Sequence, residues 1–243
     1  MNRSRPHLFG MLAGLFLAGG LVFSSMLATA TWLKIKNSQY VSVKGSVQKN
    51  VESDLIIWSG SFQTEAETLI DAQHQIQADR ARVEKFLTGA GITNGTFAPM
   101  AIEELKASQK SPDGFVSQRT TGYRLSQTIS VESADVDRLD KLDTAPLVEQ
   151  GVIFTVAAPE FVYTRAGDTK IEMLADATKD ARARAGQIAM QGGRSIAQLH
   201  DADQGIFQIT PRHSVATSWQ GECDTTSREK TITAVVTATF QLK

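Results

Sequence analysis

The side chains that could bind a metal or catalyse a reaction are scattered along this chain. The four histidines are His7, His74, His200 and His213, and none has a second ligand at the i, i+4 spacing that places two ligands on one helix face. The segment 200–203, with sequence HDAD, offers carboxylates to a hard cation but lacks the longer oxygen-rich loop of calcium sites. We therefore predict no metal site and no cofactor.

Cys223 is the only cysteine, so it cannot form a disulfide within the chain. It stands between Glu222 and Asp224, whose negative charges oppose formation of the thiolate that a cysteine nucleophile requires. A role in redox sensing or in an intermolecular disulfide stays open.

Other catalytic patterns are also absent from the sequence. The serines include no Gly-x-Ser-x-Gly motif, and the glycines are not grouped into a phosphate-binding loop. Glu103 and Glu104 lie in a strand-like run, where adjacent side chains point to opposite faces and cannot act together as acid and base. We predict no catalytic residues and a non-enzymatic protein. The alternative is an enzyme or small-ligand receptor whose site is assembled from residues distant in sequence.

The charge balance excludes one class of partner. Lys and Arg number 25 and Asp and Glu 26 among 243 residues, which gives a formal net charge of -1. Proteins that bind nucleic acids need an excess of positive charge to neutralise phosphates. We therefore expect no nucleic-acid partner.

An uncharged apolar segment sets the compartment. Residues 8–30 contain no ionisable side chain and are long enough to span a bilayer. Arg3 and Arg5 precede the segment, so the positive-inside rule keeps residues 1–7 in the cytoplasm, although Lys34 and Lys36 follow it. We expect the segment to reach the inner membrane and to place the C-terminal domain in the periplasm.

The same segment has features of an anchor and of a signal peptide. Ala28, Thr29 and Ala30 satisfy the small-x-small rule for cleavage after Ala30, which would release the body to the periplasm. The apolar run is, however, longer than a typical signal core. The small residues Gly10, Gly14 and Ala18 recur every fourth position, a spacing that lets a second anchor helix approach closely. We favour an uncleaved, membrane-bound anchor.

After a linker at 31–39, residues 40–243 predict a single α+β domain. Alternating runs at 40–45 and 54–62 predict two strands paired as a hairpin through 48–53, followed by a helix at 65–87 that ends at Gly89 and Gly91. Strand-like runs at 96–105 and 122–131 flank a turn signal at 111–114. The order recurs with a strand at 151–156, a helix at 168–190 ending at Gly192 and Gly193, and strands at 195–210 and 230–242. We predict two β-α-β-β units that share one antiparallel sheet, with both long helices on one face.

The helix at 168–190 predicts its own packing face. Its apolar residues with helical spacing are Ile171, Leu174, Ala177, Ala181, Ala185 and Ile188. Because the middle of this face carries only methyl groups, the helix can lie close to its neighbour, and a large residue at Ala181 should not fit.

These segments together resemble the SIMPL-domain family, in the branch of bacterial envelope proteins with an N-terminal hydrophobic segment. The matching stretches are 41–45, 54–58, 170–182, 204–209 and 230–242, and the stretch 211–228 fits least well. The resemblance implies a β-α-β-β fold, export to the envelope, assembly into higher oligomers and no established enzymatic activity. Roles suggested for relatives include protection against envelope or oxidative stress.

Strands near both ends of the domain predict an unpaired sheet edge. The run 231–240 contains no charge and no proline, so little in it would discourage pairing with another chain if it lay at an edge. A central position would instead satisfy it internally. We expect a homo-oligomer that acts as a scaffold or binding module, and a lysine at Thr237 should then favour the monomer.

Overall fold

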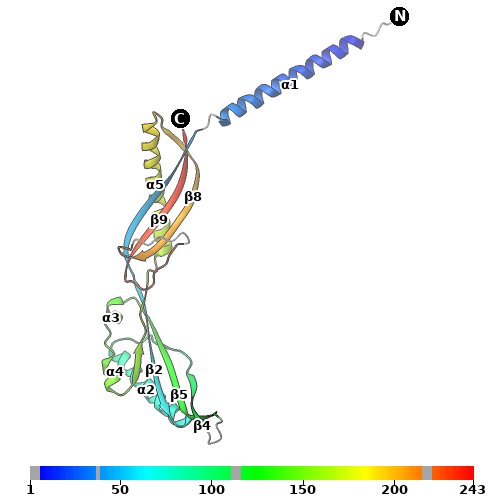
Figure 1. The fold of residues 1–243 in the computed structure, drawn as a ribbon. Helices are drawn as coiled ribbons and strands as arrows, with labels where there is room; N and C mark the ends of the chain where they lie inside the picture. The colour runs from blue at the N-terminus through cyan, green and yellow to red at the C-terminus, as the bar shows by residue number, and fades with distance from the viewer. Residues whose placement is uncertain (1–5, 37–38, 111–115, 215–220) are drawn as a thin grey trace. The chain divides into compact units, whose positions relative to one another are not determined.

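The computed structural model describes residues 6–36, 39–110, 116–214 and 221–243 (Figure 1). The turn predicted at 111–114, and Arg3 and Arg5, lie outside the described residues. The helices are α1 (Pro6–Lys36), α2 (Leu69–Gly89), α3 (Val136–Asp140), α4 (Ala145–Glu149) and α5 (Ala166–Gln191). The strands are β1 (Tyr40–Glu52), β2 (Leu55–Ala66), β3 (Thr96–Phe97), β4 (Ala101–Lys110), β5 (Val116–Ser133), β6 (Ile153–Val156), β7 (Glu160–Val162), β8 (Ile196–Pro211) and β9 (Glu229–Leu242).

The chain divides into two compact units. The first contains residues 1–47, 173–205 and 234–243, and the second contains residues 48–172 and 206–233. The predicted α+β class, the antiparallel pairing and the apolar N-terminal helix are confirmed. The strands do not pool into one sheet, because they form a three-stranded sheet of order β1-β9-β8 and a separate six-stranded sheet.

In the first unit, one long helix covers the three-stranded sheet through small side chains. Ala177, Ala181 and Ala185 of α5 are fully buried against Val236, Ala238 and Phe240 of β9 and Val43 of β1. The predicted alanine face is therefore confirmed, and Leu174 packs against the same cluster.

Two residues assigned to this face are exposed instead. Ile171 and Ile188 retain 73% and 54% of their accessible surface, whereas Met173 and Ala189 are buried. The buried row thus follows every fourth residue, 173, 177, 181, 185 and 189, rather than a mixture of third and fourth residues. A row of every fourth residue runs at an angle to the helix axis. The surface of a twisted sheet runs at a similar angle beneath the helix, so it contacts this row along its length.

The second unit has its own core between α2 and a six-stranded sheet. The sheet has the order β3-β5-β2-β6, with β4 also paired to β5 and β7 to β2. Ile76 and Val83 of α2 pack on Trp58 and Phe62 of β2, and all four are buried. Thr68 caps the start of α2 by accepting a hydrogen bond from the Asp71 backbone N–H at 3.1 Å.

The predicted stops of both long helices are confirmed. Helix α2 ends at Gly89 and is followed by Gly91 at φ 77°, while α5 ends at Gln191 and is followed by Gly193 at φ 68°. Only glycine adopts such left-handed backbone angles at little cost. The start of α2 was predicted too early, at residue 65, because β2 continues to Ala66 through its pairing with Tyr123 of β5.

The predicted hairpin between the first two strands was wrong, and the position of the last strand is now known. Strand β1 forms no hairpin with β2, because β1 lies beside β9 while β2 pairs with β5, β6 and β7. The backbone N–H groups of Ser53 and Asp54, between the two strands, donate to the carbonyls of Arg228 and Val162. Strand β9 occupies the centre of its sheet, so the run 231–240 is not at an edge.

Candidate functional site

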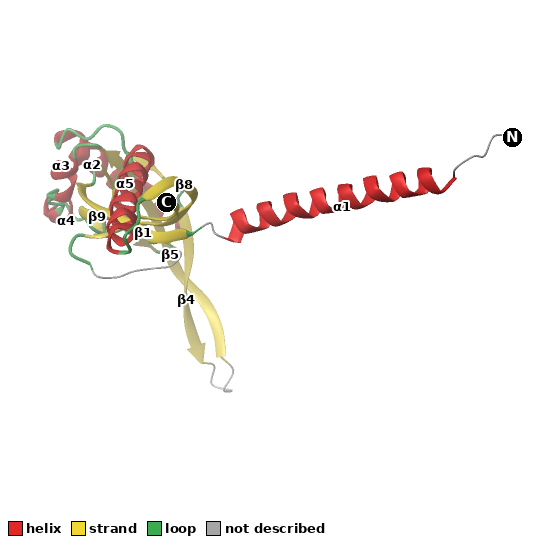
Figure 2. Cartoon of the chain, turned by 90° about the horizontal axis from the view of Figure 1, so that it is seen from above, coloured by secondary structure: helices red, strands yellow, loops and turns green. Residues whose placement is uncertain are grey.

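A two-stranded arm in the second unit is the most exposed regular structure of its sheet. Strand β4 pairs with β5 from Ala101 opposite Ser126 to Lys110 opposite Val116. Pairing between β2 and β5 begins at Tyr123, so residues 116–121 have β4 as their only described neighbour strand. These six residues are all exposed. The resulting ribbon extends away from the rest of its sheet (Figure 2).

The outer edge of β4 is unpaired within the described residues, since β4 pairs with β5 alone. The Leu105 carbonyl accepts a hydrogen bond from the Thr121 hydroxyl of β5 at 3.1 Å, so it points inward. Backbone groups of successive residues point to alternate sides of a strand. Glu104 and Lys106 therefore present their N–H and C=O groups at the free edge, which is a template for another strand.

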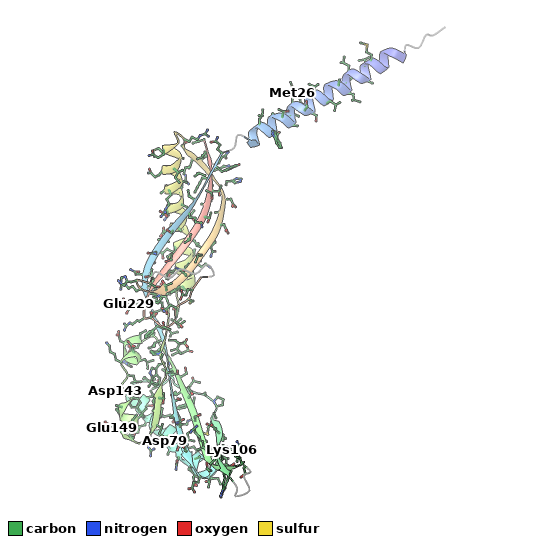
Figure 3. All side chains as sticks on the ribbon, in the orientation of Figure 1. Met26, Asp79, Lys106, Asp143, Glu149 and Glu229 are labelled. Carbon is green, nitrogen blue, oxygen red and sulfur yellow. The ribbon has the colours of Figure 1, made fainter. Side chains whose placement is uncertain are left out.

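Charges of opposite sign line both faces of this edge. On one face, Arg124 donates to Glu65 of β2 at 2.7 Å and to Glu103 of β4 at 2.9 Å. These two hydrogen bonds hold the pKa of Arg124 above its ordinary value. On the other face lies Lys106, which Figure 3 labels on the arm. Its ammonium is 3.4 Å from the Glu104 carboxylate, and both side chains are about half exposed.

A hollow of about 600 Å³ lies along the arm. It is lined by Glu67, residues 107–109 and residues 119–121. Its walls are mostly polar residues of the two-stranded arm, so the hollow offers hydrogen-bonding groups rather than an apolar surface.

A second candidate is a polar cleft of about 500 Å³ between the end of β1 and the start of α5. Lys49 donates to Glu172 at 2.8 Å, and the Tyr163 and Thr169 hydroxyls lie 2.9 Å apart. Arg165 also lines the cleft and lies over the Tyr163 ring. No sequence pattern predicted this cleft, because Lys49 and Glu172 are 123 positions apart.

The second unit also contains a buried ion pair. Lys230 and Asp224 are 1% and 5% exposed, and the Lys230 ammonium donates to the Asp224 carboxylate at 3.1 Å and to its backbone carbonyl at 2.6 Å. Burial raises the pKa of Asp224, but hydrogen bonds from Thr226 and Lys230 outweigh it and lower that pKa to about 2. Asp224 is thus held ionised as a structural group.

A similar balance holds Asp54 ionised beside the polar cleft. Partial burial raises its pKa, but hydrogen bonds from the Thr164 backbone N–H at 2.7 Å and hydroxyl at 2.9 Å lower it below the ordinary value overall. Arg165 adds a cationic neighbour 3.6 Å away. This carboxylate fixes the turn that leads into α5.

The structure does not gather the scattered histidines and acids. Among the described residues, no three His, Cys, Asp or Glu side chains are placed to hold a metal ion. Segment 200–203 lies on β8 with exposed side chains, and His200 contacts the Tyr40 ring, with 4.5 Å between centroids. Cys223 is exposed and forms a single β-bridge with Ile209.

The row Gly10, Gly14 and Ala18 is exposed along α1. No described atom outside the helix lies within 4 Å of a Cβ built on either glycine, so the row is open. Residues Gly10–Leu33 of α1 are long and apolar enough to cross a membrane, by length and composition, as either an anchor or a signal sequence.

Together these features define an α+β protein with an apolar N-terminal helix and two antiparallel sheets, each covered by one long helix. The chain belongs to the SIMPL family, described as a protein of unknown function (DUF541), and the family model matches residues 41–240. The predicted family resemblance is therefore confirmed. No curated protein matches the chain.

Proposed function

We propose that this chain is a non-enzymatic envelope protein, anchored in the inner membrane by α1, whose periplasmic body self-associates as a scaffold. The observation that carries the proposal is the exposed arm with its unpaired β4 edge. A two-stranded ribbon with both faces in water has little buried surface of its own. Such an element gains stability when its edge pairs with another strand.

The geometry of α1 supports an anchor over a cleaved signal peptide. Twenty-four residues at about 1.5 Å each exceed the roughly 30 Å of a bilayer core. The small-x-small site at 28–30 lies inside the helix, which continues to Lys36. A protease that binds its substrate as an extended strand would have to unwind this turn first. Trp32, near the end of the apolar run, suits the membrane interface.

The shifted pKa values support a structural rather than a catalytic role. General acids and bases are tuned toward neutral pH. In this chain the pKa values of Asp54 and Asp224 move down and that of Lys49 moves up, away from neutrality, because each group is held by hydrogen-bonded partners. A link to envelope or oxidative stress protection rests on the family resemblance alone and belongs to the same proposal.

The test is the mass of the full-length chain in detergent, measured by light scattering. We expect an oligomer. A variant in which residues 106–121 are replaced by Asn-Gly, which closes a tight hairpin between the paired Leu105 and Gly122, should have a lower mass and an unchanged melting temperature. Gly14→Leu is the matched control for association through the anchor. A monomeric wild-type chain at tens of micromolar would refute the scaffold.

The polar cleft favours a second candidate function, a small-ligand receptor. The cleft is lined by two cations, Lys49 and Arg165, and by three acids, Glu52, Asp168 and Glu172. This lining would suit a ligand that carries both a positive and a negative charge. Native mass spectrometry of the purified chain tests this reading. A co-purifying small molecule that is lost in Lys49→Ala and retained in Lys85→Ala, outside the cleft, would favour the receptor, and its absence would disfavour it.

A further inference from the structure

We propose that the β4 edge pairs with the β4 edge of a second copy of this chain, antiparallel and centred on Leu105. This inference rests on the proposed self-association and specifies the surface that mediates it. The donor and acceptor groups of β4 that point away from β5 would bond to the same groups of the partner copy, which extends the two-stranded ribbon to four strands.

The direction of pairing follows from the charges. A parallel, in-register pair would place Glu104 against Glu104 and Lys106 against Lys106. An antiparallel pair is closed by a two-fold axis, so each contact occurs twice. Centred on Leu105, it places Glu104 of each copy opposite Lys106 of the other. The close contact between these side chains within one chain, at 3.4 Å, shows that they share a face.

The register follows from the backbone. The Leu105 carbonyl points toward β5, so the backbone groups of Glu104 and Lys106 point outward. The outward groups of two copies meet only if the two-fold axis passes through a residue, not between two residues. A register centred on Glu104 places the two Glu104 side chains opposite each other, and one centred on Lys106 does the same for the two lysines. Like charges directly opposite each other are destabilising. Centring on Leu105 instead brings two partly buried leucines together at a non-hydrogen-bonded pair, where opposing side chains are closest.

The same charges limit other pairings of this edge. Charged residues on an edge strand normally discourage indiscriminate association. Here Glu103 and Glu104 are negative and Lys106 is positive, so these charges disfavour pairing with apolar strands. They also disfavour the registers that place like charges opposite each other. The irregularity between Leu105 and Lys106 places the extra residue on β5, so the outer edge of β4 remains continuous.

Cysteine cross-linking in the full-length, membrane-bound chain tests the register. In a Cys223→Ser background, Leu105→Cys should form a disulfide-linked dimer under mild oxidation, because opposed Cα atoms at such a pair lie about 4.5 Å apart, within the range of a disulfide. Ala107→Cys is the matched control and should not cross-link. A dimer through Ala107→Cys, equal yields from both variants, or no dimer from either would overturn the proposal.

Charge reversal provides a second, independent measurement. In the Leu105→Cys background, Glu104→Lys and Lys106→Glu should each reduce the dimer yield several-fold, because each replaces two attractive contacts by two repulsive ones. Co-expression of the two variants with different tags should restore a mixed dimer, since opposite charges then meet at both positions. Unchanged yields in the single variants, or no mixed dimer, would contradict the pairing.

The mass measurement separates failure of this inference from failure of the proposed function. An oligomeric chain that gives no cross-link through Leu105→Cys would retain the scaffold and refute the β4 pairing. A monomeric chain would refute both.

Discussion

Gly45 of β1 lies directly against Ala181 of α5. A Cβ placed on Gly45 would come within 2.8 Å of the Ala181 methyl carbon, closer than real Cβ atoms approach a neighbour. The absence of a side chain on one element and the single methyl group on the other set how closely the helix lies on the three-stranded sheet. Asp180 holds the same contact by accepting a hydrogen bond from the Ser46 backbone N–H at 2.9 Å.

This contact predicts that Ala181→Leu destabilises the protein by about 1–3 kcal/mol, because added methylenes in a close-packed interior force neighbours apart. Ala183→Leu is the matched control, since Ala183 lies on the exposed face of the same helix. Arg182→Leu, also exposed, should likewise cost little. Urea unfolding of the purified variants measures the difference. Equal midpoints for positions 181 and 183 would mean that the alanine face is not the buried one.

The buried ion pair predicts a loss of stability in Asp224→Asn of about 3–5 kcal/mol, because Lys230 would remain buried without its counter-charge. The double variant Asp224→Asn/Lys230→Met should lose less than the sum of the two single variants, since it leaves no unpaired charge. Additive losses in this cycle would argue against coupling between the two groups.

The same pair predicts a pH dependence. The folded-state pKa of Asp224, about 2, lies below the value of 3.8 for a free aspartate, so ionised Asp224 stabilises the fold above about pH 3.8. That contribution is lost as the pH falls from there through 2. The difference in unfolding free energy between wild type and Asp224→Asn should shrink over this window. A constant difference from pH 6 to pH 2 would contradict the assignment.

If α1 is an uncleaved anchor, we expect the N-terminus to be intact and residues 40–243 to lie outside the cytoplasm. Mass spectrometry of the membrane-extracted protein should give the full-length mass, and a reporter active only in the cytoplasm should be inactive when fused to Lys243. A fragment that begins at residue 31 would support the signal peptide instead. Strong reporter activity would refute the proposed topology.

The central position of β9 changes the expected outcome for Thr237→Lys. Because β1 and β8 occupy both sides of β9, the partly exposed Thr237 side chain lies on a sheet face and not at a free edge. We now expect the variant to keep the oligomeric mass of the wild type by light scattering. A shift to monomer in Thr237→Lys, with Glu104→Lys unaffected, would move the interface from the arm to the three-stranded sheet.

The sequence by itself determined the features that depend on neighbours along the chain. The apolar run of α1, the glycines that end α2 and α5, and the alanines at the centre of α5 all follow from local periodicity and backbone freedom. The exposed Ile171 and Ile188 mark the limit of this reasoning. A helix of known amphipathicity still has several apolar rows, and the twist of the sheet beneath it selects which one is buried.

Only the tertiary structure decided which strands are neighbours. An alternating pattern indicates which residues lie on each face of a strand, but it does not indicate the neighbouring strand. We therefore expected β1 to pair with the next strand, whereas its neighbour is β9, almost two hundred residues later. The cleft at Lys49 and Glu172 likewise joins residues 123 positions apart. Lys230 and Asp224 are only six positions apart, but the fold decides that their side chains are buried. Contacts between distant segments and the burial that they produce depend on the whole fold, and no local pattern records them.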